Sequence, residues 1–284
     1  MSGRGDVIPF DQLPDRFAER IEDPPVDPVT PRPAATIVLL RDGVAGMEVL
    51  LMRRTRNAGF VPGAYVFPGG RVDGTDADAR LVELLADLTE GQAADRLQLY
   101  DADPPAIAYY LAALREAFEE TGILVGERPD RSPPPTAAED AEVDSVRDAL
   151  MQEQISFADA LRRLGCRIDG DAIEYIAHWI TPKPEPRRYD TRFFAAKVRD
   201  AAEAIIDPRE MTDALWLTPS EALDRLDSGD LPMVFPTIKT IEQLSVYETV
   251  SEALEGIGGQ QVRTILPTLV VTPTGISLEI DEED

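Results

Sequence analysis

The chain has only one cysteine, one histidine and three lysines among its 284 residues. A single cysteine, Cys166, excludes an internal disulfide and a thiolate metal cage. A Ser-His-Asp triad would have to be built around His178, and a structural strand position is the simpler interpretation of that residue. No apolar run approaches the roughly 18 residues that a membrane helix needs, and the first residues lack the apolar core of a leader peptide. These absences predict a soluble, cytoplasmic protein.

Positive charge is scarce. Lysine and arginine together number 28 against 53 aspartates and glutamates, which gives a formal net charge of −25. A chain of this charge repels nucleic-acid backbones and anionic membranes, so neither is expected as a partner. A phosphate-bearing ligand would need a metal cation or a local group of arginines to reverse the sign of the field.

The order of the predicted elements favours an α+β fold with a mixed sheet. A proline-rich arm over 1–33, with a short helix at 11–20, precedes the main domain at 34–284. Alternation and turn residues predict strands at 35–40, 48–54, 64–67, 173–181, 192–198 and 213–217, and helices at 219–226 and within 237–256. The early strands are joined as hairpins, which argues against a doubly wound parallel sheet.

One segment concentrates carboxylates. Residues 105–121 are predicted to form a helix that follows a helix-start signal and ends at Gly122. At about 100° per residue, Glu116, Glu119 and Glu120 share one side of this helix, and an apolar stripe lies on the opposite side. Arg115 stands on the flank, four residues before Glu119. The stripe consists of Ile107, Tyr110, Leu111, Leu114 and Phe118.

This acidic cluster conflicts with helix physics unless something compensates it. Like charges at i,i+4 repel, and glutamates near a helix C-terminus oppose the helix dipole. A solvated acidic face is one interpretation. The other is a hard cation that takes oxygen ligands, Mg²⁺ or Mn²⁺.

The motifs around this helix resemble those of the Nudix hydrolases. REAFEETGI over 115–123 matches the second half of the Nudix signature, and FPGG over 67–70 matches its opening. Gly70 and Arg115 are 45 positions apart, whereas the signature closes this gap in about 14. The resemblance therefore implies a Nudix α/β/α sandwich with helical insertions at about 72–104 and 127–170. The upstream glutamate of the signature would fall at Ile107, so Asp73 or an acid within 76–90 would have to replace it.

An interrupted signature of this kind is similar to the branch of peroxisomal-type coenzyme A diphosphatases. The motif of that branch upstream of FPGG is matched at Leu50, Leu51, Arg54 and Gly63, while Met52, Thr55 and Gly59 depart from it. Further similarity extends over 178–194 and 210–223. The implied activity is Mg²⁺- or Mn²⁺-dependent hydrolysis of a diphosphate bond, with coenzyme A or an acyl-coenzyme A as substrate.

The resemblance also implies roles for individual residues. Gly70, Glu116, Glu119 and Glu120 are the candidate metal ligands, and Arg115 would orient the carboxylates. The general base would be one of the glutamates or a loop acid such as Glu210. The candidate substrate contacts are Arg54, Arg71, Arg188 and Arg192, each of which has a surface ion pair as its alternative.

Two other functional classes stay open at this level. One is a pyrophosphatase acting on NADH, ADP-ribose, a nucleotide sugar or a nucleoside triphosphate. The other is a Nudix-fold module that binds such a ligand without turnover. A homodimer is an expectation from the long N-terminal arm and from the habit of the family.

Overall fold

The computed structural model describes residues 7–9, 21, 27–56, 62–273 and 275–280. Its centre is a mixed sheet in the order β10-β3-β2-β9-β8-β11, in which β2 and β9 run parallel while β8 and β9 run antiparallel. The helix predicted at 11–20 lies outside the described residues. The strands of this sheet are β2 (Arg32–Gly43), β3 (Gly46–Arg54), β8 (Ile173–Ile180), β9 (Tyr189–Lys197), β10 (Met211–Leu217) and β11 (Thr264–Ile265), with β4 (Tyr65–Val66) and β5 (Gly69–Arg71) attached.

The sheet opens in the middle, and this opening positions the FPGG segment. The strands β2 and β3 pair with each other only near their hairpin, over Leu40–Gly43. Away from the hairpin, β2 instead pairs with β5 over Ala34–Thr36, and β3 pairs with β4 at Met52 and Arg53. The FPGG segment, which runs from the end of β4 into β5, therefore enters the gap between two diverging strands.

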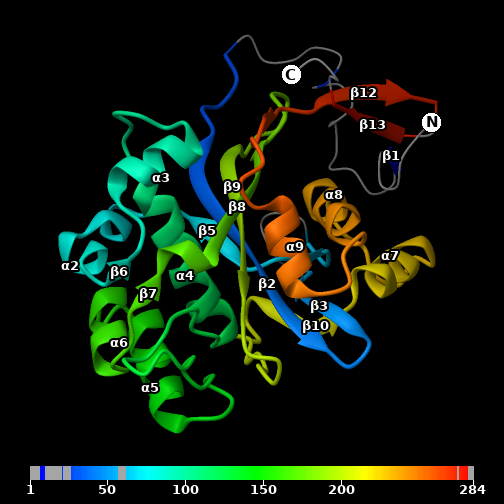
Figure 1. Ribbon diagram of the computed structural model, residues 1–284. Coiled ribbons are helices and arrows are strands. Elements are labelled where there is room, and N and C mark those ends of the chain that lie inside the picture. The colour runs from blue at the N-terminus through cyan, green and yellow to red at the C-terminus, as the bar shows by residue number, and fades with distance from the viewer. Residues whose placement is uncertain (1–6, 10–20, 22–26, 57–61, 274, 281–284) are drawn as a thin grey trace.

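Helices cover both faces of the sheet, which gives the α/β/α sandwich that the sequence predicts (Figure 1). Both faces need covering because successive residues of β2 are buried on opposite sides: Ile37 and Leu39 pack with α4, whereas Val38 and Leu40 pack with the C-terminal helices. One layer holds α4 (Ala106–Thr121). The opposite layer holds α7 (Pro219–Asp227), α8 (Phe235–Leu244) and α9 (Val250–Ile257).

The two predicted insertions pack against each other on the outer side of α4 (Figure 1). Their strands β6 and β7 pair in parallel, and the Arg162 guanidinium donates to the Arg80 carbonyl at 3.0 Å. The first insertion contains η2 (Gly74–Ala77), α2 (Ala79–Val82), β6 (Leu85–Ala86) and α3 (Glu90–Leu97). The second contains α5 (Ala141–Met151), α6 (Phe157–Arg163) and β7 (Ile168–Asp169), which η3 (Gly170–Ala172) joins to β8.

This arrangement changes the environment expected for α4. The helix has the predicted bounds within one residue, but it is buried on nearly all sides rather than along one apolar stripe. Ala108, Ala112 and Ala113, outside the stripe, are fully buried. The insertions enclose the outer side of the helix. Helical periodicity could not predict this burial, because it comes from segments that are distant in the sequence.

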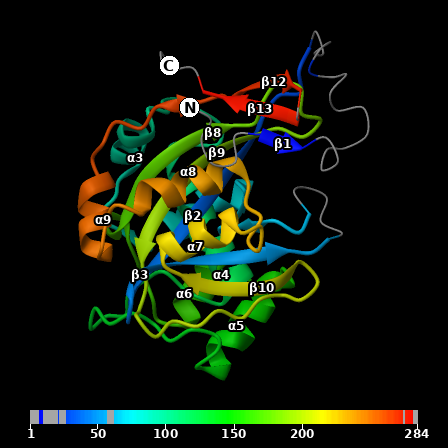
Figure 2. The same ribbon diagram turned by 90° about the vertical axis from the view of Figure 1, so that its right-hand side faces the viewer.

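A second, small sheet joins the two ends of the chain. The strand β1 (Val7–Pro9) pairs with β13 (Gly275–Glu279), which forms a hairpin with β12 (Thr268–Thr272). Figure 2 shows this sheet at one end of the molecule, beyond β8 and β9. Within the described residues, no helix has the length and apolar character needed to cross a membrane.

Candidate active site

The turn after β4 places two glycine backbones against the acidic side of α4. The Gly69 N–H donates to Glu120 Oε2 at 3.0 Å. A Cβ at Gly69 would collide with the Ala35 carbonyl and the Thr36 backbone, and a Cβ at Gly70 would collide with the Glu116 carboxylate. Gly69 therefore requires glycine, because only a bare backbone can approach the strand this closely, and a side chain at Gly70 would displace the Glu116 carboxylate.

Arg115 organises the carboxylates. Its Nη1 donates to Glu116 Oε1 at 2.9 Å and to Glu119 Oε2 at 3.1 Å, and its Nη2 donates to the Arg71 carbonyl at 3.0 Å. Bidentate hydrogen bonds to Asp76, at 2.8 Å and 3.0 Å, use the remaining donors. A guanidinium has five N–H donors, and these five hydrogen bonds occupy all of them. Burial lowers the pKa of Arg115, but its hydrogen bonds to Asp76 and the charges of Glu116, Asp76 and Glu119 outweigh burial and raise the pKa.

Asp76 is the acid that the sequence left unassigned. Its side chain is 1% exposed, whereas Asp73 is 63% exposed and lies 3.7 Å from the guanidinium. Its Oδ2 also accepts from the Asp73 N–H at 2.8 Å, which fixes the carboxylate within η2. Counting back from Arg115 places the upstream glutamate of the signature at position 107, but this residue is Ile107 and it is buried in the core. Measured forward from Gly70, the acid is Asp76, six residues on and at the start of the first insertion rather than after it.

The carboxylates of Glu116 and Glu120, one helical turn apart, lack a full set of hydrogen-bond and charge partners. Burial is the main reason that the pKa of Glu116 rises to about 7 and that of Glu120 to about 8. The negative charge of Glu119 raises the pKa of Glu116 further, and that of Glu116 does the same for Glu120. The pKa of Glu119 is also raised, mainly by burial, although Arg115 opposes the shift.

This donor set suits a hard cation. Within the described part of the chain, no three carboxylate, imidazole or thiol side chains converge into a metal cage, and Glu119 is turned toward Arg115. Mg²⁺ does not need such a cage, because it is commonly held by one or two carboxylates together with waters and substrate phosphates. Glu116 and Glu120 offer two partly buried carboxylates that a divalent cation would neutralise.

We expect the metal-free protein to lose stability as the pH rises from about 5 to 8. The folded-state pKa values of Glu116 and Glu120 lie above their ordinary value of 4.5, so the folded state binds more protons than the unfolded state in this window. That contribution is complete below the ordinary pKa and is lost as the pH rises through the folded values. Thermal unfolding in EDTA should show this fall, and Glu120→Gln should make it smaller. A Tm of the wild type that rises relative to Glu120→Gln across the window contradicts the assignment.

Arg54 and Glu210 lie close to the same carboxylates. The charge of Arg54 lowers the pKa of Glu120 and that of Glu210 raises it, both secondary to burial. The Glu210 carbonyl accepts from the Thr55 N–H at 2.9 Å, which ties its loop to the end of β3. Arg54 Nε is buried and has no hydrogen-bond partner in the described structure. One arginine donor at the site is thus free for an anionic ligand.

The other three candidate arginines have different surroundings. Arg71 is exposed, and its backbone carbonyl receives Arg115. Arg188 is buried and donates to the carbonyls of Thr181 and Val29. Arg192 is 4% exposed, pairs with Asp190 at 2.7 Å and stacks over the Tyr109 ring at 4.4 Å. The structure therefore brings Arg54 to the carboxylates and engages Arg188 and Arg192 in contacts within the fold.

The lone histidine has the structural environment that its sequence position suggested. His178 Nε2 bonds Asp190 Oδ1 at 2.7 Å and His178 Nδ1 bonds Thr264 Oγ1 at 2.9 Å. These contacts join β8, β9 and β11. Cys166 is likewise buried, and burial raises the pKa of its thiol.

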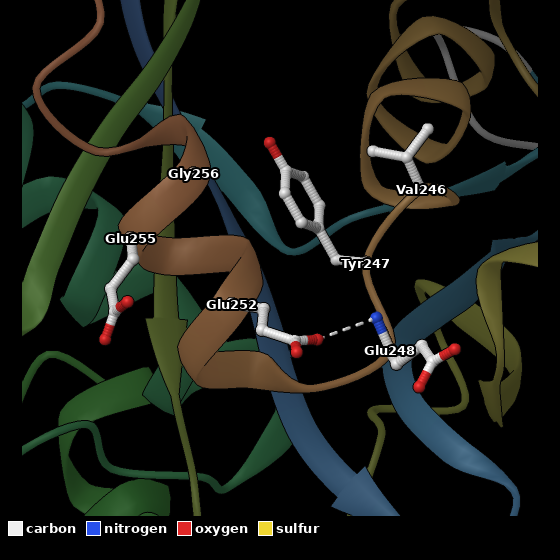
Figure 3. A pocket seen from close by; sticks show the side chains of 6 residues that line it. All are labelled: Val246, Tyr247, Glu248, Glu252, Glu255 and Gly256. Atoms are coloured by element: carbon white, nitrogen blue, oxygen red, sulfur yellow. Dashed lines mark hydrogen bonds between the residues drawn. The ribbon is translucent and has the colours of Figure 1, made fainter.

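A hollow of about 560 Å³ lies between Tyr247 and α9 (Figure 3), on the face of the sheet opposite α4. Its lining includes the carboxylates of Glu248, Glu252 and Glu255. The Glu252 carboxylate accepts from the backbone N–H groups of Glu248 and Thr249, so it serves as part of a capping box for α9. This hollow is separate from the carboxylates of α4.

Comparisons with known proteins agree with this geometry. A family model described as the NUDT19 Nudix domain matches residues 30–244. The acyl-coenzyme A diphosphatase NUDT19 of Homo sapiens is 28% identical over 264 residues, which are 81% of this chain and 70% of that protein. The protein of the same name in Gallus gallus is 28% identical over 242 residues, and this chain spans 64% of its length. The crystal structure of a Nudix hydrolase from Alicyclobacillus acidocaldarius has a TM-score of 0.62 and 29% identity, covering 81% of this chain and 98% of the other.

Proposed function

Because the chain belongs to the NUDT19 Nudix family, we propose that it is a Mg²⁺- or Mn²⁺-dependent diphosphatase acting on coenzyme A or its acyl esters. The protein is a Nudix hydrolase. The observation that supports the metal dependence is the pair of partly buried carboxylates, Glu116 and Glu120, beside the Gly69–Gly70 backbone. The choice of substrate is supported by the relatives named acyl-coenzyme A diphosphatase.

The proposed mechanism assigns each residue a physical task. A bound divalent cation neutralises charge on the diphosphate and lowers the pKa of a water ligand. Glu116 and Glu120 would hold that cation, with the Gly70 carbonyl and Glu119 as further oxygen ligands. Arg115 keeps Glu116 and Glu119 in place through its hydrogen bonds.

Arg54 and Glu210 would act on the substrate side. The unpartnered Arg54 Nε is a donor for a phosphate oxygen, and an arginine here offsets the strong negative field of the chain. Glu210 is exposed at the end of its loop and near Glu120. It is our candidate for the base that accepts a proton from the attacking water, with the α4 glutamates as alternatives.

A substrate panel tests this proposal. With Mg²⁺ present, free coenzyme A and acetyl-coenzyme A should each be cleaved at the diphosphate into a nucleotide half and a phosphopantetheine half. NADH, ADP-ribose, a nucleotide sugar and a nucleoside triphosphate should have kcat/KM values at least about 10-fold lower, a difference of about 1.4 kcal/mol in transition-state binding. Products are measured by liquid chromatography with Mg²⁺ and with EDTA.

The outcomes separate the alternatives. Preference for NADH, ADP-ribose or another nucleotide contradicts the choice of coenzyme A but retains the diphosphatase. Binding of these ligands without turnover favours a non-catalytic module. Equal rates in EDTA and in Mg²⁺ contradict the metal requirement.

A further inference from the structure

A buried arginine of the second insertion contacts the end of the carboxylate helix. Arg147 lies on α5 and is 3% exposed. Its Nε donates to the Glu119 carbonyl at 2.9 Å and to the Phe118 carbonyl at 3.2 Å. These are backbone acceptors in the last turn of α4, on the residue that bonds Arg115 and on its neighbour.

The last turn of α4 is held both by its own capping bond, from the Gly122 N–H to the Phe118 carbonyl at 2.9 Å, and by groups from outside the helix. The Thr121 carbonyl accepts from the Ile205 N–H and the Gly122 carbonyl accepts from the Ala137 N–H. Gly122 has the left-handed φ of 70°, and a Cβ there would collide with Ala137. Gly122 ends the helix, and the second insertion and the loop before β10 hold the carbonyls at this end in place.

The charge of Arg147 is suited to this place. The last turn of α4 has no basic residue of its own, although it carries Glu119 and Glu120 against the negative end of the helix dipole. Besides Glu119, Arg147 faces Asp144 and Asp148 of its own helix and Asp207, which lies three residues before Glu210. Its Nη2 is buried without a partner in the described structure. Its own hydrogen bonds are therefore incomplete. Burial lowers the pKa of Arg147, and the charges of the surrounding acids offset this cost only in part.

We propose that Arg147 is a positioning residue for the reaction: its guanidinium holds the Phe118 and Glu119 carbonyls and thereby sets Glu119 and Glu120 against the Gly69–Gly70 turn. This inference rests on the proposed metal-dependent hydrolysis and assigns the second insertion a part in it. Arg147 acts through the backbone of α4, and the groups that meet metal and substrate are those of the carboxylate site.

Arg147→Met tests the inference, with Arg163→Met as the matched control. Both arginines lie in the second insertion, but Arg163 is exposed at the end of α6. Well below the Tm, Arg147→Met is expected to lower kcat by about 10-fold or more and to leave KM within about 2-fold, because ground-state substrate contacts remain. Arg147→Lys keeps the charge and one donor, so it should recover part of kcat. Arg163→Met should match the wild type.

Mn²⁺ affinity, measured by calorimetry, distinguishes positioning from a purely electrostatic effect. If the carboxylates lose their arrangement, Arg147→Met should bind Mn²⁺ about 10-fold more weakly. If only a positive charge has been removed, Mn²⁺ should bind more tightly, and that result overturns the proposal. A lowered Tm with unchanged kcat and Mn²⁺ affinity also overturns it, since Arg147 would then be a structural cap alone.

The remaining outcomes are also decisive. If Arg147→Met does not fold, Arg147→Lys decides, because a lysine variant with the kcat and Mn²⁺ affinity of the wild type contradicts the need for the guanidinium. A wild type that neither binds Mn²⁺ nor cleaves any diphosphate refutes the proposed function itself. An active wild type with an equally active Arg147→Met refutes only the role of Arg147.

Discussion

Replacing Glu120 by glutamine is expected to lower kcat by at least about 100-fold, as removal of a metal ligand and its charge should do. Glutamine keeps the length of the side chain, and its amide oxygen still accepts from the Gly69 N–H, which bonds Glu120 at 3.0 Å in the wild type. The fold should therefore survive while the buried negative charge is lost. Steady-state rates with Mg²⁺ and calorimetric titration with Mn²⁺ measure the two effects on the same sample.

Glu255→Gln is the matched control for this substitution. Glu255 is exposed on α9, on the opposite face of the sheet, and the same chemical change there should leave both rate and metal uptake unaltered. A Glu120→Gln enzyme with the rate of the wild type would show that this carboxylate does not serve the reaction.

Asp76→Asn is the second substitution with a large expected effect. It removes the negative partner of Arg115 at a position where the carboxylate is 1% exposed. Breaking a buried ion pair costs about 3–5 kcal/mol, and Glu116 and Glu119 retain part of the compensation, so we expect about 3 kcal/mol. In a chain of this length the Tm should fall by roughly 5–10 °C. Because Arg115 also orients Glu116 and Glu119, kcat should fall by about 10-fold or more.

Asp73→Asn provides the comparison. Asp73 is exposed, lies 3.7 Å from Arg115 and precedes η2 as its N-cap, a position where asparagine serves about as well as aspartate. Its Tm and rate should stay close to those of the wild type. If Asp73→Asn proves as damaging as Asp76→Asn, the guanidinium does not depend on Asp76 in particular.

Features of the fold and site that arise from short stretches of sequence were predictable. The helix over 105–121, its stop at Gly122 and the grouping of Glu116, Glu119 and Glu120 follow from helical periodicity and capping. The mixed sheet, though not the order of its strands, followed from hairpin connections and from the resemblance to the Nudix signature. The α/β/α sandwich was confirmed for this reason.

Predictions that depended on docking between distant segments were less complete. Asp76 and Arg115 are 39 positions apart, and a count from Gly70 would have identified the acid, whereas a count from Arg115 passed through the insertion. The alternation of side chains in the strand over 192–198 did not reveal that Arg192 would pair with Asp190 and stack over the Tyr109 ring. Helical periodicity over 141–164 predicted helices, yet nothing in it connected Arg147 to the carbonyls of α4.

The amino-acid sequence by itself determined which carboxylates share a helix face, where that helix ends, and that the chain is strongly acidic. These properties depend on neighbours within a few positions, whose geometry is set by the helix and turn. Only the tertiary structure decided which acid pairs with Arg115, which arginine lies beside the carboxylates, and how the two insertions enclose α4. These features depend on which buried charges find partners. The partners are residues far apart in the chain, which come together only when the sheet and the helices pack.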